Sequence, residues 1–196
     1  MTDKRTISVY DSKSSEYANL TKVNKPSKHL SVFMSNVIAN GIVLDLGCGP
    51  GVASYFMKKK GFKVTATDAS MEMVKIAKAE NGIDVLHHSF EDINWINTFD
   101  GIWAHFSLLH AKREIFPSHL AALKNALKNN GVFTIGMKLG QGEQRDNIGR
   151  FYAYYSEEQL IKYLEAAGYQ IDEINYGEDI GLDGKSAKWI IIRSHV

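Results

Sequence analysis

The sequence predicts an α/β fold with a doubly wound, mostly parallel sheet that carries helices on both faces. From residue 41 onward, short apolar runs alternate with segments of helical periodicity, which is typical of a parallel sheet covered on both sides. The first of these runs leads directly into a glycine-rich turn. The last two runs, Tyr169–Ile174 and Trp189–Ile192, have only a polar loop between them. They therefore predict a hairpin, with one strand antiparallel to the others.

The elements follow one another in a regular order. Apolar residues at helical spacing predict helices at residues 11–20 and 27–39, the second ended by Asn40-Gly41. Five strands are then expected before the final hairpin: Ile42–Leu46, Phe62–Thr67, Ile83–His87, Phe99–His105 and Val132–Met137. Four further helices are expected, two of them with serine N-caps: Val52–Lys60, Ser70–Glu80, Arg113–Leu127 and Ser156–Gly168. Residues 139–150 are polar and predict a loop.

Length and composition predict one ordinary globular domain over residues 1–196. Within it we expect N-terminal helices that form a lid (1–40), a ligand-binding core (41–138) and a loop, helix and hairpin (139–196). The formal net charge of +1 gives no strong nucleic-acid signal. With the single cysteine Cys48, no signal-like N-terminus and no long apolar run, we expect a cytoplasmic protein without a membrane partner. Composition does not indicate an oligomeric state.

The turn after the first strand predicts a ligand site. In Gly47-Cys48-Gly49-Pro50-Gly51, the three glycines permit positive φ and a close approach of ligand to backbone. A dinucleotide fingerprint would need Gly-x-Gly-x-x-Gly, but position 52 is Val, and Pro50 lacks an N–H. Both departures disfavour NAD and FAD, and with them a nicotinamide oxidoreductase.

Two aspartates flank this turn in the expected sheet. Asp45 lies just before the glycines and is placed to attract an ammonium group, directly or through water. Asp68 ends the second strand, where a carboxylate can accept hydrogen bonds from both hydroxyls of a ribose. The alternative for Asp68 is a simple helix cap. A ligand that combines a ribose with a free amino acid group would fit both aspartates.

These residues resemble the class I S-adenosylmethionine-dependent methyltransferases. Residues 43–51 are similar to that family's first motif, residues 67–70 to its second, residues 89–92 to its adenine segment, and residues 99–110 and 130–133 to the fourth and fifth strand regions. The resemblance implies a seven-stranded sheet, S-adenosylmethionine as cofactor and methyl transfer. It also implies a set of cofactor-binding residues: Asp45, Gly47, Cys48, Gly49, Gly51, Asp68, Ala69, Met73, Ser89, Phe90, Glu91 and Ala104. Ser89 departs from the family, which often has Asp there.

Two histidines after the fourth strand are candidate catalytic residues. His105 ends the strand and His110 follows it, and either can take a proton near neutral pH or orient an acceptor. The alternative is that they only pack or hydrogen-bond locally. Because the cofactor arrives activated, a general base is needed only if the acceptor must lose a proton. No cluster has zinc-site spacing, so we expect no metal.

The segment after the fifth strand is the expected acceptor site. Arg145 and Arg150 could bind a carboxylate or phosphate, and Tyr152 and Tyr155 could wall the pocket. The alternative is that the aromatic run belongs to the core and the arginines form surface ion pairs. With no added domain, we expect a small-molecule acceptor. A tRNA or protein substrate, or cofactor binding without catalysis, remain the alternatives.

Overall fold

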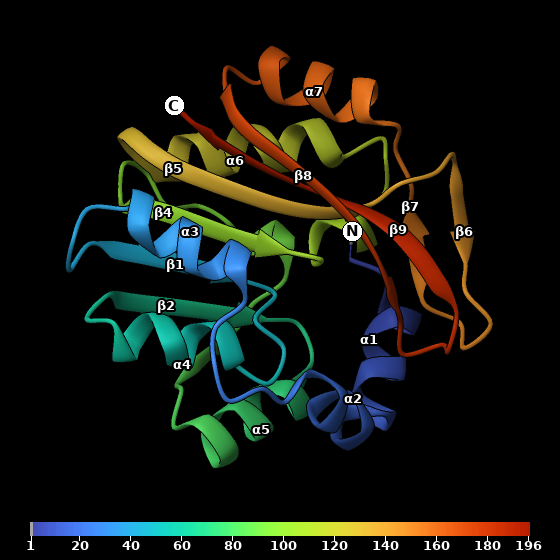
Figure 1. Ribbon diagram of the computed structural model, residues 1–196. Coiled ribbons are helices and arrows are strands. Elements are labelled where there is room, and N and C mark those ends of the chain that lie inside the picture. The colour runs from blue at the N-terminus through green and yellow to red at the C-terminus, as the bar shows by residue number, and fades with distance from the viewer. Residues whose placement is uncertain (1) are drawn as a thin grey trace.

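The computed structural model describes residues 2–196 and contains one seven-stranded sheet of order β3-β2-β1-β4-β5-β9-β8 (Figure 1). Its strands are β1 (Ile42–Leu46), β2 (Lys63–Asp68), β3 (Val85–His87), β4 (Phe99–His105), β5 (Leu127–Lys138), β8 (Gln170–Ile180) and β9 (Ser186–His195). Neighbouring strands from β3 to β5 are parallel, and β9 is antiparallel to both β5 and β8. The predicted sheet with one antiparallel strand is therefore confirmed.

Alternating side chains of the strands face two separate cores. Val43 and Trp103 pack on one face against α3 (Lys28–Asn36) and α4 (Val52–Lys59). Leu44 and Ile102 point to the other face, against α6 (Phe116–Ala126) and α7 (Glu157–Ala166). Because strand side chains alternate with period two, each strand contributes to both layers, and helices cover both faces as the apolar runs predict.

The helix that follows β2 begins and ends where the sequence signals it. In α5 (Met71–Asn81), the Ser70 hydroxyl accepts a hydrogen bond from the Met73 N–H, and Gly82 closes the helix in the left-handed conformation. The same logic holds for α7, where Ser156 and Gln159 form a reciprocal capping box. Local sequence signals therefore determine where both helices begin.

Four regions differ from the sequence prediction. In the final hairpin, β8 continues to Ile180 and β9 begins at Ser186, so most of the predicted polar loop is strand. Residues 4–21 form two helices, α1 (Lys4–Ser12) and α2 (Ser14–Thr21), rather than one helix at 11–20. Part of the expected loop at 139–150 belongs to a hairpin of β6 (Glu143–Arg145) and β7 (Phe151–Ala153). Strand β5 begins at Leu127 and continues past the expected Asn-Asn-Gly turn, which Asn130 accommodates with a φ of 62°. In each case long-range packing, which local spacing does not report, decides the outcome.

Figure 1 shows α1, α2, the β6–β7 hairpin and the β8–β9 turn gathered at one end of the sheet. This is the end where the parallel strands finish, the usual place for ligands in such sheets. No helix within residues 2–196 has the length and apolar character needed to cross a bilayer.

Candidate active site

The loop after β1 has the backbone geometry that its glycines permit. Gly47, Gly49 and Gly51 all have positive φ, at 68°, 54° and 79°. A Cβ on Gly47 would come within 2.5 Å of the Ser107 Cβ, and one on Gly49 within 3.3 Å of the Tyr17 ring. Conformation disfavours a side chain at all three glycines, and space also excludes one at Gly47, so the loop presents bare backbone.

Asp68 joins this loop to the next one. Its Oδ2 accepts a hydrogen bond from the Gly49 N–H at 2.8 Å, and its Oδ1 accepts one from the Ser70 N–H at 2.9 Å. Burial raises the pKa of this carboxyl above its ordinary value, and the two backbone hydrogen bonds oppose that rise. Each oxygen retains acceptor capacity beyond its backbone bond.

A cavity of about 690 Å³, counted with its part open to solvent, lies over this loop. That volume falls in the usual range of small-ligand sites, about 300–1,000 Å³. Eight sequence-predicted residues line it: Gly47, Gly49, Asp68, Ala69, Met73, Phe90, His105 and His110. The structure therefore brings the glycine loop, the end of β2, the adenine segment and both histidines to one place, with Tyr10 and Tyr17 from the N-terminal helices above them.

Six other predicted cofactor residues do not line this cavity. Asp45 is buried behind the loop, where its Oδ2 accepts a hydrogen bond from the Ser54 hydroxyl at 2.6 Å and burial raises its pKa to about 7. A Cβ on Gly51 would meet Ala77, so this glycine serves helix packing. Ser89 donates its hydroxyl to Asp92, and the Thr2 hydroxyl donates to Glu91 at 2.5 Å. The remaining two are Cys48 and Ala104.

The two histidines have different surroundings. The His105 ring stacks on Trp103 with centroids 4.8 Å apart, and burial lowers its pKa to about 3. His110 lies 2.6 Å through Nδ1 from the Phe151 carbonyl and 2.9 Å through Nε2 from the Tyr10 hydroxyl. Since a carbonyl can only accept, Nδ1 carries the proton and Nε2 accepts from Tyr10. Burial lowers the His110 pKa to about 4, so both rings are neutral at neutral pH.

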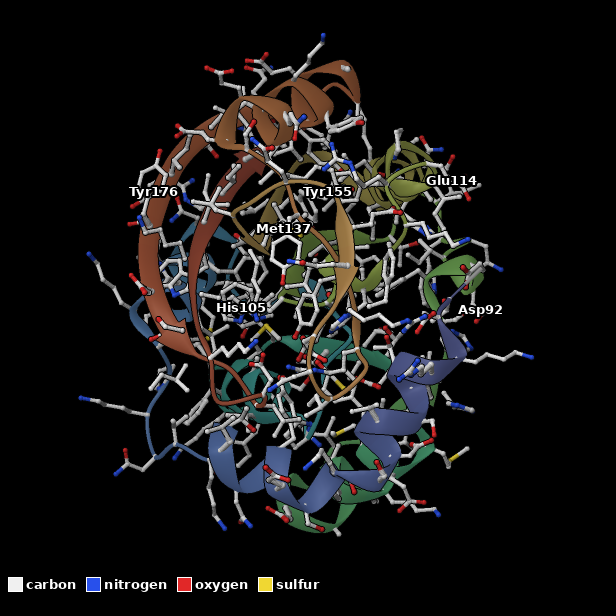
Figure 2. All side chains as sticks on the ribbon, turned by 90° about the vertical axis from the view of Figure 1, so that its right-hand side faces the viewer. Asp92, His105, Glu114, Met137, Tyr155 and Tyr176 are labelled. Carbon is white, nitrogen blue, oxygen red and sulfur yellow. The ribbon has the colours of Figure 1, made fainter. Side chains whose placement is uncertain are left out.

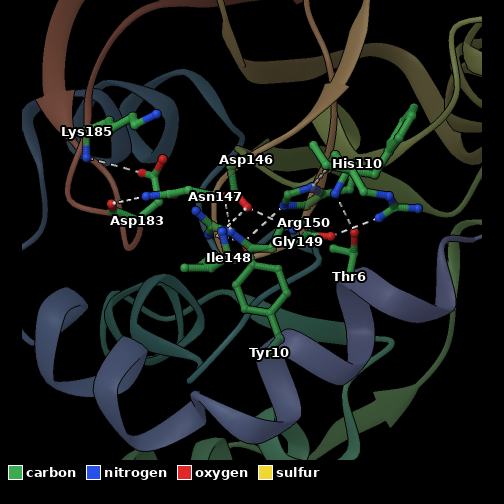
Figure 3. Close-up of polar contacts among 12 residues, drawn as sticks. Thr6, Tyr10, His110, Asp146, Asn147, Ile148, Gly149, Arg150, Asp183 and Lys185 are labelled. Atoms are coloured by element: carbon green, nitrogen blue, oxygen red, sulfur yellow. Dashed lines mark hydrogen bonds and ion pairs between the residues drawn. The ribbon is translucent and has the colours of Figure 1, made fainter.

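Polar contacts hold the N-terminal helix α1 against the β6–β7 hairpin (Figure 3). Arg150 donates Nε–H to Asp146 at 2.9 Å and Nη1–H to the Tyr10 hydroxyl at 3.0 Å. The Phe151 N–H donates to the Thr6 hydroxyl at 2.8 Å. These contacts hold α1 across the cavity, in the place expected for a lid.

A second cavity, about 970 Å³ with its open part, lies beside the first. It is lined by Leu20, Thr21, Leu109, Lys138, Arg150, Tyr152, Asp179, Ile180, Gly181, Leu182, Ala187 and Trp189, together with Tyr10, Tyr17 and Phe106. The last three residues also line the first cavity, so they form a wall common to both.

Two predicted acceptor residues lie elsewhere. Arg145 forms an ion pair with Asp3 at 2.7 Å and lines neither cavity. Tyr155 is fully buried between Phe116 and the Tyr163 ring of α7, and Figure 2 shows it beside that helix rather than near His105. Its expected place in the pocket wall is wrong because its ring belongs to the core. Arg150 and Tyr152 line the second cavity, and their place at an acceptor site stays a prediction.

Sequence reasoning missed most residues of the second cavity, among them Lys138, Trp189 and Phe106. Lys138 ends β5, and the general rule that ligands lie at strand ends could have identified it. Trp189 looks like an ordinary strand residue in the sequence. Phe106 has a φ of 58°, a left-handed conformation that bulky residues rarely adopt and that no local signal announces. No group of His, Cys, Asp or Glu within residues 2–196 is arranged to hold a metal ion.

Comparison with known proteins agrees with this geometry. Residues 43–131 match a family model described as a methyltransferase domain. An uncharacterized methyltransferase of Staphylococcus carnosus is 33% identical over 115 residues, which cover 58% of this chain and 56% of that protein. The mitochondrial ubiquinone biosynthesis O-methyltransferase of Schizosaccharomyces pombe is 24% identical over 164 residues, 80% of this chain and 57% of that one. The chain thus spans little more than half the length of these relatives.

A solved structure is similar over almost the whole chain. The 1,6-didemethyltoxoflavin-N1-methyltransferase of Burkholderia thailandensis, with 1,6-didemethyltoxoflavin and S-adenosylhomocysteine bound, superposes with a TM-score of 0.78. It covers 96% of this chain and 86% of its own at 18% identity, so this likeness concerns the fold. Sheet order, glycine loop and family match together define an S-adenosylmethionine-binding fold. Residues 43–131 match the methyltransferase-domain family, and the fold is that of the class I S-adenosylmethionine-dependent methyltransferases.

Proposed function

We propose that the protein catalyses methyl transfer from S-adenosylmethionine to a small-molecule acceptor. The observation that carries this proposal is the wall of Tyr10, Tyr17 and Phe106 that the two cavities share. A donor in the first cavity and an acceptor in the second would meet across it. When bound, the cofactor supplies a methyl group already activated on a sulfonium, so the protein's main tasks are alignment and exclusion of water.

The first cavity suits this cofactor chemically. We assign Asp68 to the ribose hydroxyls, because its two oxygens keep acceptor capacity after binding the loop N–H groups. Gly47 and Gly49 would let the amino acid end approach the backbone. Met73, His88 and Phe90 provide apolar and aromatic surface for the adenine. Asp45 would favour the ammonium from behind the loop rather than by contact.

The histidines take different roles in this proposal. His105 has a neutral ring in the cofactor cavity beside Phe106, with centroids 4.3 Å apart, so its role is to orient the acceptor's nucleophilic group. A pKa of about 3 makes it a weak base, which suits a hydrogen-bond acceptor better than a proton carrier. His110 has both ring nitrogens engaged within the protein and holds the Tyr10 hydroxyl in place.

A small acceptor is favoured by enclosure and by charge. The N-terminal helices and the β6–β7 hairpin cover the site, which leaves cavities rather than an open groove. The formal net charge of +1 offers little general attraction for a nucleic acid. The similar Burkholderia structure contains a small molecule together with S-adenosylhomocysteine.

Calorimetric titration with S-adenosylhomocysteine tests the cofactor half of the proposal, with NADH as the control ligand. One-to-one binding of the first and no binding of the second are expected. Methyl release from S-adenosylmethionine across an acceptor panel then tests turnover. Folded protein that binds neither ligand would overturn the cofactor assignment. Cofactor binding with no turnover on small molecules would favour the non-catalytic or macromolecular alternatives.

A further inference from the structure

We propose that the acceptor is a small, flat aromatic or heteroaromatic anion, whose negative group is bound in the second cavity by Lys138 and Arg150. This inference rests on the proposed function and specifies its substrate class. Lys138 was not anticipated from the sequence. It replaces Arg145 as the partner of Arg150 at the acceptor site.

Lys138 is a cation without a carboxylate partner. It is half-buried at the end of β5, and its Nζ lies 4.4 Å from the centroid of the Tyr152 ring. Within residues 2–196 no carboxylate lies at ion-pair distance from Lys138, although Asp183 and Asp146 are near enough to act on it electrostatically. Burial, and secondarily Arg150, lowers its pKa below the ordinary value. An anion bound in the cavity would stabilise the charged form of Lys138, which burial destabilises.

Arg150 supplies the second positive group. Its side chain is 3% exposed, and its guanidinium carbon lies 5.4 Å from the Tyr10 ring and 5.2 Å from the Tyr152 ring. Nε and Nη1 have partners, whereas Nη2 is buried and makes no hydrogen bond within residues 2–196. A buried donor without a partner is costly. The spare N–H of Arg150 therefore favours binding of a ligand group that accepts a hydrogen bond.

One carboxylate also lines the cavity, but it is already occupied. The Trp189 Nε1–H donates to Oδ2 of Asp179 at 2.7 Å, and Asp179 is exposed on β8 near the turn into β9. Lys138 and Arg150, by contrast, are half-buried and buried. The buried ion pair with Asp146 at 2.9 Å compensates the charge of Arg150, so Lys138 supplies the uncompensated positive charge of the deeper part of the cavity and Arg150 supplies its spare N–H.

Flat rings make up part of the remaining wall, beside aliphatic residues such as Leu109 and Leu182. The Trp189 indole fits over Gly177, where a Cβ would lie only 2.1 Å from the indole Cζ2. Phe106 faces it edge-on with centroids 6.3 Å apart, and its left-handed backbone is the kind of strain found at functional sites. Tyr152 completes the set. Rings that offer both faces and edges favour a planar aromatic guest.

These walls also orient the guest. Phe106 belongs to both cavities, whereas Lys138 and Arg150 line only the second. An aromatic anion held by the two cations would direct its opposite edge toward Phe106 and the cofactor cavity. The atom to be methylated is therefore expected on the side of the ring away from the anionic group.

The test uses the full chain saturated with S-adenosylhomocysteine and three probes of matched size. These are 2-naphthoate, its neutral amide 2-naphthamide, and the saturated anion decalin-2-carboxylate, each titrated by calorimetry and by tryptophan fluorescence. Naphthoate should bind about tenfold more tightly than either analogue, because only it satisfies both the cations and the rings. Equal affinities of naphthoate and naphthamide would overturn the anionic class, and equal affinities of the two anions would overturn the aromatic class.

Three variants locate the site. Lys138→Met should lower naphthoate affinity about tenfold and leave naphthamide affinity within about twofold, and Lys138→Arg should restore most of the loss. Lys162→Met removes an equally charged but exposed side chain from α7 and should change neither affinity. An unchanged naphthoate affinity in Lys138→Met would place the anion elsewhere. Throughout, S-adenosylhomocysteine binding is measured separately, so loss of that binding signals failure of the cofactor proposal and not of the acceptor class.

Discussion

The two cavities differ in how the chain builds them. The first cavity takes eight of its nineteen lining residues from the ends of β1 and β2 and the segments just after them, within residues 46–73. The second cavity takes its lining from α1, α2, the ends of β4 and β5, the β6–β7 hairpin and the β8–β9 turn. Local backbone geometry therefore specifies a large part of the first cavity, whereas the packing of distant segments specifies the second. Substitutions in the first cavity should therefore act mainly through the local backbone, and substitutions in the second through the packing between distant segments.

The largest effect is expected from Gly49→Val. The residue has a φ of 54°, and its Cβ would lie 3.3 Å from the Tyr17 ring at the cavity. A branched side chain there should reduce S-adenosylhomocysteine affinity about a hundredfold or more, measured by calorimetry. Gly142→Val is the matched control, because Gly142 has a φ of 72° but its Cβ meets nothing within 4 Å. Equal loss in both variants would mean that backbone strain, and not the ligand site, is responsible.

Asp68→Ala should have the next largest effect on the same affinity. It removes the acceptor of the Gly49 and Ser70 N–H groups together with the proposed ribose ligand. Hydrogen bonds to a charged group contribute about 1.5–3 kcal/mol, so a loss of about tenfold to a hundredfold is expected. Asp84→Ala, which removes an exposed ion pair with Lys78, should leave the affinity unchanged. An Asp68 variant that binds normally would place the ribose elsewhere.

A pH effect on stability should follow from Asp45. Its folded pKa of about 7 lies above the ordinary 3.8, so the folded state binds the proton more tightly than the unfolded state. That contribution is fully present below the unfolded pKa and is lost as pH rises through about 7. From about pH 5 to pH 7 the wild type should lose up to about 2 kcal/mol relative to Asp45→Asn in urea unfolding. Parallel pH profiles would show that Asp45 ionises normally behind the loop.

The difference between the cavities also explains what the sequence could predict. Glycine spacing, the serine caps of α5 and α7, and the strand-end position of Asp68 are local signals with a direct physical meaning, and the structure places each as expected. The parallel sheet and its antiparallel strand follow from the same kind of signal. Such features need no knowledge of distant residues.

Fewer of the residues predicted for the acceptor site line a cavity, and the reason is physical. Tyr152 and Tyr155 are three residues apart in one aromatic run, yet one lines the cavity and the other fills the core between Phe116 and Tyr163. Nothing in their spacing distinguishes them, because the packing of α6 and α7 decides which ring is enclosed. The same holds for Arg145 and Arg150, which are separated by the turn of the β6–β7 hairpin.

Arg145→Ala should have the smallest effect and tests this distinction directly. Its guanidinium contacts Asp3 and the Gly149 carbonyl at a partly exposed position, so it clasps the N-terminal helix instead of lining a cavity. Such pairs contribute about 0–1 kcal/mol, and unfolding stability should fall by no more than that. S-adenosylhomocysteine affinity and naphthoate affinity should each stay within about threefold of wild type. If naphthoate affinity alone fell, Arg145 would belong to the proposed acceptor site. The bound anion would then lie closer to the β6–β7 hairpin than to Lys138.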